Sequence, residues 1–147
     1  MTGQTFLLVE DNPDDVALTL RALERNHMLS AVVVARDGAE ALELLFTDTG
    51  AHVNHPGLIL LDLKLPKVAG LEVLRRIRAD ERTHFIPVVI LTSSAEQADI
   101  RDSYHGGANA FVRKPVDFSE FNAAINTICT FWMLLNEPAP ESVPQPD

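Results

Sequence analysis

The chain has 147 residues, of which 46% are hydrophobic, 22% charged and 6% aromatic, with a formal net charge of -9. This size and apolar content favour one domain with a packed core and exclude a disordered chain. The acidic balance argues against nucleic acid or an anionic membrane as partner, because phosphate contacts need a basic face. A lone cysteine excludes an intrachain disulfide. With no signal peptide and no apolar stretch long enough to span a bilayer, a cytoplasmic protein is expected.

Short apolar runs alternate along the chain with segments of helical spacing. Runs of this kind, bounded by polar or turn residues, are typical of strands that are buried on both faces of a sheet. The sequence predicts such strands at Phe6–Val9, Ala31–Ala35, Leu58–Leu61, Val88–Leu91 and Ala110–Val112.

The segments that follow these strands predict helices. The first begins at Pro13 and carries Asp14 and Asp15 in its first turn, where the helix dipole favours negative charge. The other helices are expected after the N-cap Asp37, after Gly70, from about Ala95 to Tyr104, and from near Asp117 to Trp132.

This repeated strand–helix alternation predicts an α/β fold, a doubly wound parallel sheet with right-handed crossovers and helices on both faces. Ligands of such sheets bind beyond the carboxyl ends of the strands. Residues 1–135 are expected to form this domain. Residues 136–147, which include four prolines, are expected to form a disordered tail.

Polar side chains stand at the carboxyl ends of four predicted strands: Glu10 and Asp11, then Asp62, Thr92 and Lys114. Two carboxylates ~4 Å apart repel by about 4 kcal/mol at an effective dielectric of about 20. A cation that relieves this repulsion is therefore expected. Oxygen ligands without His or Cys favour Mg²⁺ over Ca²⁺.

A phosphoryl group brought to this ion could be attacked by a carboxylate oxygen to form an aspartyl phosphate. Asp62 is the expected nucleophile because it ends the central strand, flanked by the other site residues. Lys114 could pair with one phosphoryl oxygen, and Thr92 could hydrogen-bond to another.

These residues, with Pro66 and Gly70 in the loop after Asp62, resemble the receiver domain of two-component response regulators over residues 5 to about 130. The resemblance implies a flavodoxin-like (βα)5 sheet with strand order 2-1-3-4-5. It also implies that Asp62 accepts a phosphoryl group from a phosphohistidine of a sensor histidine kinase.

The same resemblance assigns further roles. It implies that Mg²⁺ is held by Glu10, Asp11, Asp62 and the backbone carbonyl of Lys64. It implies a cis peptide bond before Pro115. It also implies a switch in which an aromatic ring at Phe111 turns inward when Thr92 turns toward the phosphoryl group. The family commonly has tyrosine at position 111, and phenylalanine has no hydroxyl to hydrogen-bond outward, so the inward rotamer should be favoured.

More narrowly, the chain resembles the small single-domain regulators that partner bacterial phytochromes. The similarity lies in Leu8–Asp15, in a long loop before the third strand, in Asp62–Pro66 and in a last helix that continues through Phe131–Leu135. It implies a bacterial phytochrome as the kinase and output through contacts with a downstream protein. A monomer would leave part of the apolar surface of the last helical turns exposed to water. This predicts a homodimer interface at Phe131, Trp132, Met133 and Leu134.

The protein is expected to be a phosphoacceptor switch and not an enzyme. Its only expected reactions are Mg²⁺-dependent phosphotransfer to itself and slow self-dephosphorylation. A phosphatase of the haloacid-dehalogenase kind is the alternative, but it needs a second acid two residues after the nucleophile, where this chain has Lys64. A flavin-binding module would need a phosphate loop rich in Ser, Thr and Gly after the first strand, where this chain is acidic.

Overall fold

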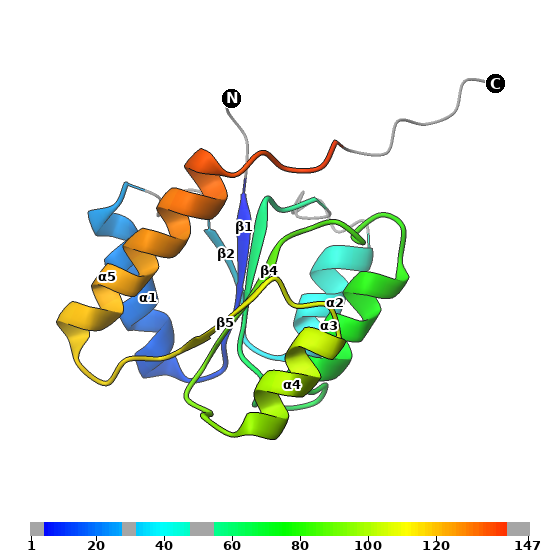
Figure 1. Ribbon diagram of the computed structural model, residues 1–147, viewed down its shortest axis with the longest axis horizontal. Coiled ribbons are helices and arrows are strands. Elements are labelled where there is room, and N and C mark those ends of the chain that lie inside the picture. The colour runs from blue at the N-terminus through cyan, green and yellow to red at the C-terminus, as the bar shows by residue number, and fades with distance from the viewer. Residues whose placement is uncertain (1–4, 28–31, 48–54, 141–147) are drawn as a thin grey trace.

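The structure is a computed structural model that describes residues 5–27, 32–47 and 55–140. Figure 1 shows the elements in chain order. The strands are β1 (Phe6–Val9), β2 (Val32–Ala35), β3 (Leu58–Leu61), β4 (Val88–Thr92) and β5 (Ala110–Arg113). The helices are α1 (Pro13–Arg25), α2 (Gly38–Phe46), α3 (Gly70–Ala79), α4 (Gln97–His105), α5 (Phe118–Cys129) and the π-helical η2 (Thr130–Leu135).

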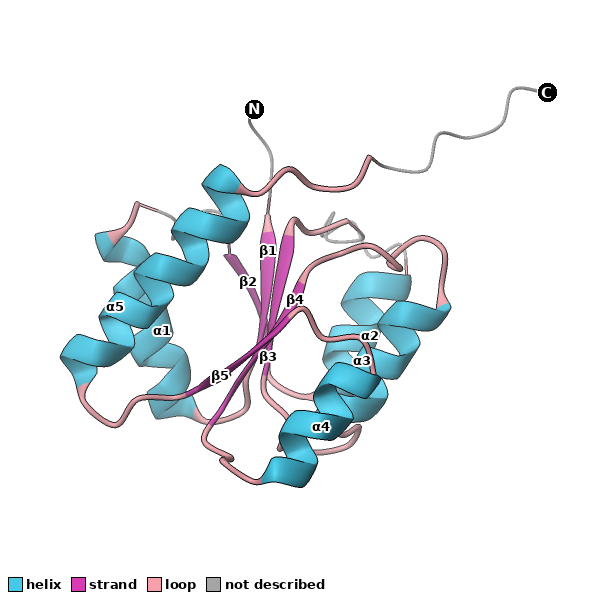
Figure 2. Cartoon of the chain, in the orientation of Figure 1, coloured by secondary structure: helices cyan, strands magenta, loops and turns pink. Residues whose placement is uncertain are grey.

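The strands form one parallel sheet in the order β2-β1-β3-β4-β5, which confirms the predicted topology. Helices α1 and α5 cover one face of the sheet, and α2, α3 and α4 cover the other (Figure 2). Both faces are therefore buried, as the continuous apolar strands predicted.

Alternate residues of each strand supply two separate cores. Leu7 and Val9 of β1 belong to the core beneath α2 and α3, where they lie with Leu74 and Ile77. Phe6 and Leu8, which point to the opposite face, belong to a second core that includes residues of α1 and α5. The packing on both faces fixes the register of the central strands, so the residues that follow them are held in place.

Side-chain caps begin three of the helices. The Asn12 side chain accepts hydrogen bonds from the backbone N–H groups of Asp14 and Asp15 at 2.9 and 3.1 Å. Asp37 caps α2, as predicted, and Asp117 caps α5. Each cap satisfies backbone donors that the first turn of a helix leaves without a partner.

The predicted boundaries need small corrections. Residue 31, predicted to begin the second strand, lies outside the described residues. Helix α4 begins at Gln97 and not at Ala95. The Ser94 hydroxyl accepts a hydrogen bond from the Glu96 backbone at 3.3 Å, and Glu96 keeps an extended conformation, so the helix starts later.

The last helix changes its geometry near its end. From Thr130 the α-helix gives way to the π-helical η2, which contains no buried residue. Phe131 and Trp132 meet edge to face, with ring centroids 4.9 Å apart. The sequence pattern predicted a continuous helix here and gave no sign of the wider turn.

Two further expectations concern the termini and the membrane. Residues 136–140 contain no helix or strand, and residues 141–147 lie outside the described ranges, so the disordered tail stays a prediction. Among the helices of the described ranges, none has the length and hydropathy needed to cross a bilayer.

Gly70 marks a close approach between the start of α3 and the end of β3. A Cβ atom at this position would lie 2.3 Å from the carbonyl oxygen of Asp62 and 2.6 Å from the Cα atom of Leu63. The Gly70 backbone also donates a hydrogen bond to Leu63 at 3.0 Å. The absence of a side chain at this position is therefore what lets α3 begin directly behind the Asp62 peptide.

We predict that Gly70→Ala lowers the free energy of unfolding by roughly 1–3 kcal/mol, because the new methyl group forces two backbone segments apart. Urea denaturation followed by circular dichroism measures this change. Gly106→Ala is the control, because its new Cβ would meet first the tip of the Leu74 side chain, at 2.9 Å, which can move aside. Equal losses in the two variants would contradict the steric role of Gly70.

Candidate phosphoacceptor and metal site

The ends of neighbouring strands bring the predicted site residues together at the lower edge of the sheet in Figure 1. The Asp62 backbone N–H donates to the carbonyl of Val9 at 3.1 Å, so Asp62 lies beside the residue that precedes Glu10. The Lys114 backbone N–H donates to the carbonyl of Thr92 at 2.8 Å. The parallel sheet therefore gathers residues from four separate parts of the sequence.

Three carboxylates meet at this edge. Glu10, Asp11 and Asp62 each place an oxygen so that all three lie within 4.8 Å of one another. Glu10 is 2% exposed and Asp62 is 7% exposed, whereas Asp11 faces the solvent. At an effective dielectric of about 20, a pair of charges ~4 Å apart repels by about 4 kcal/mol. The cluster needs positive charge, or a proton, to be stable.

The pKa of Glu10 is shifted by this environment. Burial, with the neighbouring Asp62 charge, raises the pKa of Glu10 from 4.5 to about 7, although the hydrogen bond from Lys114 acts in the opposite direction. A carboxyl group that holds its proton near neutral pH would release that proton when a cation binds beside it.

The ammonium group of Lys114 supplies positive charge at the centre of the site. Its Nζ donates to carboxylate oxygens of Glu10 at 2.5 Å, Asp15 at 2.9 Å and Asp62 at 3.1 Å. Burial alone would lower the pKa of Lys114, but the hydrogen bonds to Asp15 and Glu10 outweigh it and hold the pKa above its ordinary value. Lys114 is thus a permanent cation.

Asp15 is a site residue that the sequence analysis missed. It was placed in the first turn of a helix as a favourable charge for the dipole, which it also is. Its contact with Lys114 joins residues 99 positions apart, and neither residue type nor spacing indicated it.

The three clustered carboxylates fit a hard divalent cation. Mg²⁺ binds oxygens at about 2.0–2.1 Å, so two ligands on opposite sides of the ion lie ~4.2 Å apart, close to the spread of this cluster. All three donors are oxygens, and water can complete the coordination at the exposed Asp11. The Lys64 backbone N–H lies 3.4 Å from an oxygen of Asp62. The role of the Lys64 carbonyl as a further ligand stays a prediction.

The predicted switch residues occupy neighbouring strands. Thr92 at the end of β4 is fully buried, and its hydroxyl oxygen lies 3.4 Å from the Ser94 backbone N–H. Phe111 of β5 pairs with Ile90 of β4 and is half-buried against the core beneath α3. Phe111 is thus partly buried, and its role in a switch with Thr92 stays a prediction.

One site prediction is wrong. Within the described residues no peptide bond is cis, so the bond before Pro115 is trans. The trans isomer is favoured by about 0.5–1 kcal/mol before proline. In this arrangement Lys114 already reaches its three carboxylates, so its contacts do not require the cis form.

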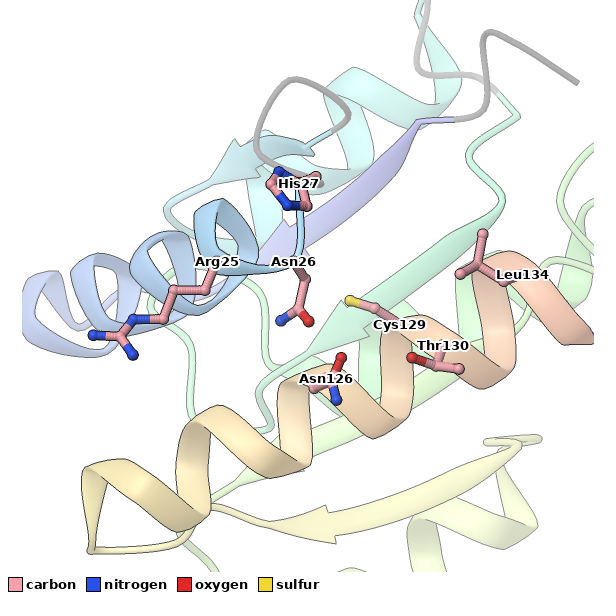
Figure 3. Close-up of a pocket in the computed structure, with 7 residues that line it drawn as sticks. All are labelled: Arg25, Asn26, His27, Asn126, Cys129, Thr130 and Leu134. Carbon is pink, nitrogen blue, oxygen red and sulfur yellow. The ribbon is translucent and has the colours of Figure 1, made fainter.

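The predicted interface residues lie away from this edge. Phe131 and Leu134 are exposed, whereas Trp132 and Met133 pack partly against the core beside α1 and α5. Leu134 also borders a cavity of about 210 Å³ between the ends of α1 and α5 (Figure 3). Ligand pockets usually have about 300–1,000 Å³. The cavity contains none of the predicted phosphoacceptor, metal or switch residues and is too small for an ordinary cofactor.

A sequence model of the response regulator receiver domain matches residues 6–126. The probable methanogenesis regulatory protein FilR2 of Methanothrix harundinacea (strain 6Ac) is 39% identical over 128 residues, which cover 87% of this chain and 83% of that protein. Response regulator Rcp1 of Synechocystis sp. (strain ATCC 27184 / PCC 6803 / Kazusa) is 34% identical over 132 residues, which cover 88% of this chain and 89% of Rcp1.

Solved structures show the same similarity. The phosphorylated cyanobacterial phytochrome response regulator RcpA has a TM-score of 0.87 at 36% identity and covers 95% of this chain and 100% of its own. The Mn²⁺-bound form of Rcp1 has a TM-score of 0.82 at 31% identity, and the match covers 94% of this chain and 100% of the Rcp1 chain. The bacteriophytochrome response regulator AtBRR has a TM-score of 0.70 at 52% identity, and the match covers 91% of this chain and 98% of the AtBRR chain.

The receiver-domain match spans most of the chain, and the acidic cluster, the lysine and the strand order agree with it. Receiver domains are phosphoacceptor switches that hold a divalent metal ion. The protein therefore belongs to the receiver-domain family of the response regulators of two-component systems.

Proposed function

We propose that Asp62 is the residue that accepts the phosphoryl group. The observation that carries this proposal is the position of its side chain, which shares the acidic cluster with Glu10 and Asp11 and has an oxygen on Lys114 Nζ at 3.1 Å. Asp11 is exposed, and Glu10 is bound more tightly by Lys114. Asp62 thus lies within the carboxylate cluster, and one of its oxygens already accepts a hydrogen bond from the Lys114 ammonium.

The phosphoryl donor is a phosphohistidine of a sensor histidine kinase. A carboxylate oxygen of Asp62 attacks the phosphorus, the phosphorus–nitrogen bond breaks, and the imidazole leaves with the electron pair of that bond. Lys114 keeps its proton and pairs with one phosphoryl oxygen, while the Thr92 hydroxyl donates to another. The product is an acyl phosphate on Asp62.

The ion that completes the site is Mg²⁺, held by Glu10, Asp11 and Asp62 with the carbonyl of Lys64 as a further ligand. Its hard oxygen ligands and the preference of Mg²⁺ for phosphate oxygens support this assignment. The ion would neutralise charge that develops on the phosphoryl oxygens during transfer.

Phosphorylation reaches the surface of the protein through Thr92 and Phe111. When the Thr92 hydroxyl turns toward the phosphoryl group, it vacates space that the half-buried Phe111 ring can fill. Their positions on adjacent, paired strands support this coupling. Because Phe111 has no hydroxyl, no outward hydrogen bond opposes its inward turn.

The partner we propose is a histidine kinase of the bacterial phytochrome type, in the cytoplasm. RcpA and AtBRR, which are similar to this chain over more than nine-tenths of its length, are phytochrome response regulators. Residues 1–135 act as the receiver domain, with residues 136–147 as a Pro-rich extension. Output passes to a downstream protein by surface contacts.

We predict that Asp62→Asn abolishes phosphorylation by acetyl phosphate in the presence of Mg²⁺, because an amide is a much poorer nucleophile than a carboxylate. Separation of phosphorylated from free chains on a phosphate-affinity gel measures the labelling rate. Asp14→Asn, which removes the same charge at an exposed position of α1, should be labelled at the rate of the parent protein. Chelation of Mg²⁺ should stop labelling of the parent.

Labelling of Asp62→Asn at the parental rate would show that another residue accepts the phosphoryl group. Sustained release of phosphate from a phosphate ester would instead favour the phosphatase alternative. That outcome is not expected, because residue 64, where such enzymes carry an acid, is an exposed lysine.

The proposed homodimer uses the surface of η2 that is formed by Phe131, Trp132, Met133 and Leu134. Leu134 is 72% exposed, and Phe131 and Leu135 are also exposed, which leaves adjacent apolar surface in contact with water. Burial of such surface against a second copy is worth roughly 25 cal/mol per Å². This apolar surface at the end of the last helix supports the dimer.

We predict that Leu134→Glu converts the dimer to a monomer in sedimentation velocity experiments, because a buried carboxylate without a partner would oppose association. Phe85→Glu is the matched control, since Phe85 is a 70% exposed apolar residue far along the chain from η2. A parent protein that sediments as a monomer, or a Leu134→Glu variant that sediments as a dimer, would contradict this interface.

A further inference from the structure

Each N–H group of the Lys114 ammonium already has a hydrogen-bond acceptor in this structure. An ammonium group carries three protons, and Nζ donates to three carboxylates, those of Glu10, Asp15 and Asp62. The Lys114 side chain is 8% exposed, so water has little access to replace any of the three. A phosphoryl oxygen that pairs with Lys114 must therefore replace one of these carboxylates as the acceptor of an N–H group.

The three partners of Lys114 differ in what else they can bind. Glu10 and Asp62 belong to the carboxylate cluster that fits a divalent cation, and Asp15 does not. Asp15 comes from the first turn of α1, where its backbone N–H is held by the Asn12 cap at 3.1 Å. Its carbonyl accepts from the Thr19 hydroxyl at 2.7 Å, so the residue is fixed from both sides.

From these contacts we infer that Asp15 is a positioning residue for phosphoryl transfer, an inference that rests on the proposed function of Asp62. When a cation draws the oxygens of Glu10 toward itself, Lys114 loses one acceptor and keeps Asp15. Asp15 then holds the ammonium beside Asp62, and the N–H group that had bonded to Glu10 can donate to a phosphoryl oxygen. Without Asp15, the ammonium would be held less firmly beside Asp62 once the cation has taken the oxygens of Glu10.

The strength of this contact sets the expected effect. Asp15 is 28% exposed, so water screens its contact with Lys114 more than it would screen a fully buried pair. We therefore expect loss of Asp15 to slow phosphorylation about tenfold, which corresponds to about 1.4 kcal/mol of activation free energy.

The test compares phosphorylation by acetyl phosphate and Mg²⁺ in five variants. Asp15→Asn should be about tenfold slower than the parent, while Asp14→Asn, its neighbour in the same helical turn, should stay within about twofold. In a Lys114→Ala background, Asp15→Asn should cause no further slowing, because its effect acts through Lys114. Asp15→Ser is a second variant that shortens the side chain, in case Asn disturbs the fold, and thermal unfolding identifies such a disturbance.

Several results would overturn the inference. Parental rates in Asp15→Asn and Asp15→Ser would show that Lys114 needs no such anchor, and the proposed role of Asp62 would stand. Equal slowing with and without Lys114 would show that Asp15 acts by another route. Calorimetric Mg²⁺ affinity should be similar in Asp15→Asn and Asp14→Asn. A selective loss in Asp15→Asn would make Asp15 a ligand and not a positioning residue. A parent that takes no label at Asp62 would remove both proposals.

Discussion

Electrostatic repulsion at the carboxyl edge of the sheet is the constraint on which this site depends. Glu10, Asp11, Asp15 and Asp62 supply four negative charges when ionised, and Lys114 supplies one positive charge, which leaves a net charge of -3. A proton on Glu10 can relieve part of this charge, as its pKa of about 7 indicates. A divalent cation relieves more of it and leaves the carboxylates ionised. The same excess of negative charge therefore favours the binding of a divalent cation at this edge of the sheet.

The fold creates this arrangement at the expense of local stability, and the two cores compensate. Strands that are apolar on both faces fix the register of β1 and β3, and the residues that follow them are carried to one edge. Gly70 allows α3 to start against the Asp62 peptide, and the Asn12 cap orients the first turn of α1, which carries Asp15. Each of these contacts belongs to the packing of the fold and also determines the position of a charge in the site.

The sequence was sufficient for the features that depend on periodicity and on strand ends. Apolar runs predicted the strands, and the rule that parallel strands end at one edge brought Glu10, Asp62 and Lys114 together before any distance was known. It was insufficient for features that depend on long-range geometry. The contact between Asp15 and Lys114 requires the first turn of α1 to lie beside the residue that follows β5, which no local pattern encodes. Neither the trans bond before Pro115 nor the π-helical turn at Thr130 is encoded by a local residue pattern.

Titration of the protein with Mg²⁺ by isothermal calorimetry tests the central claim most directly. If the acidic edge depends on a cation, the parent binds one Mg²⁺ per chain, with release of protons that come largely from Glu10. Asp11→Asn, which removes the exposed ligand and none of the Lys114 contacts, should weaken binding about tenfold or more. A parent protein that binds no Mg²⁺, or an Asp11→Asn variant that binds it as tightly as the parent, would contradict this account.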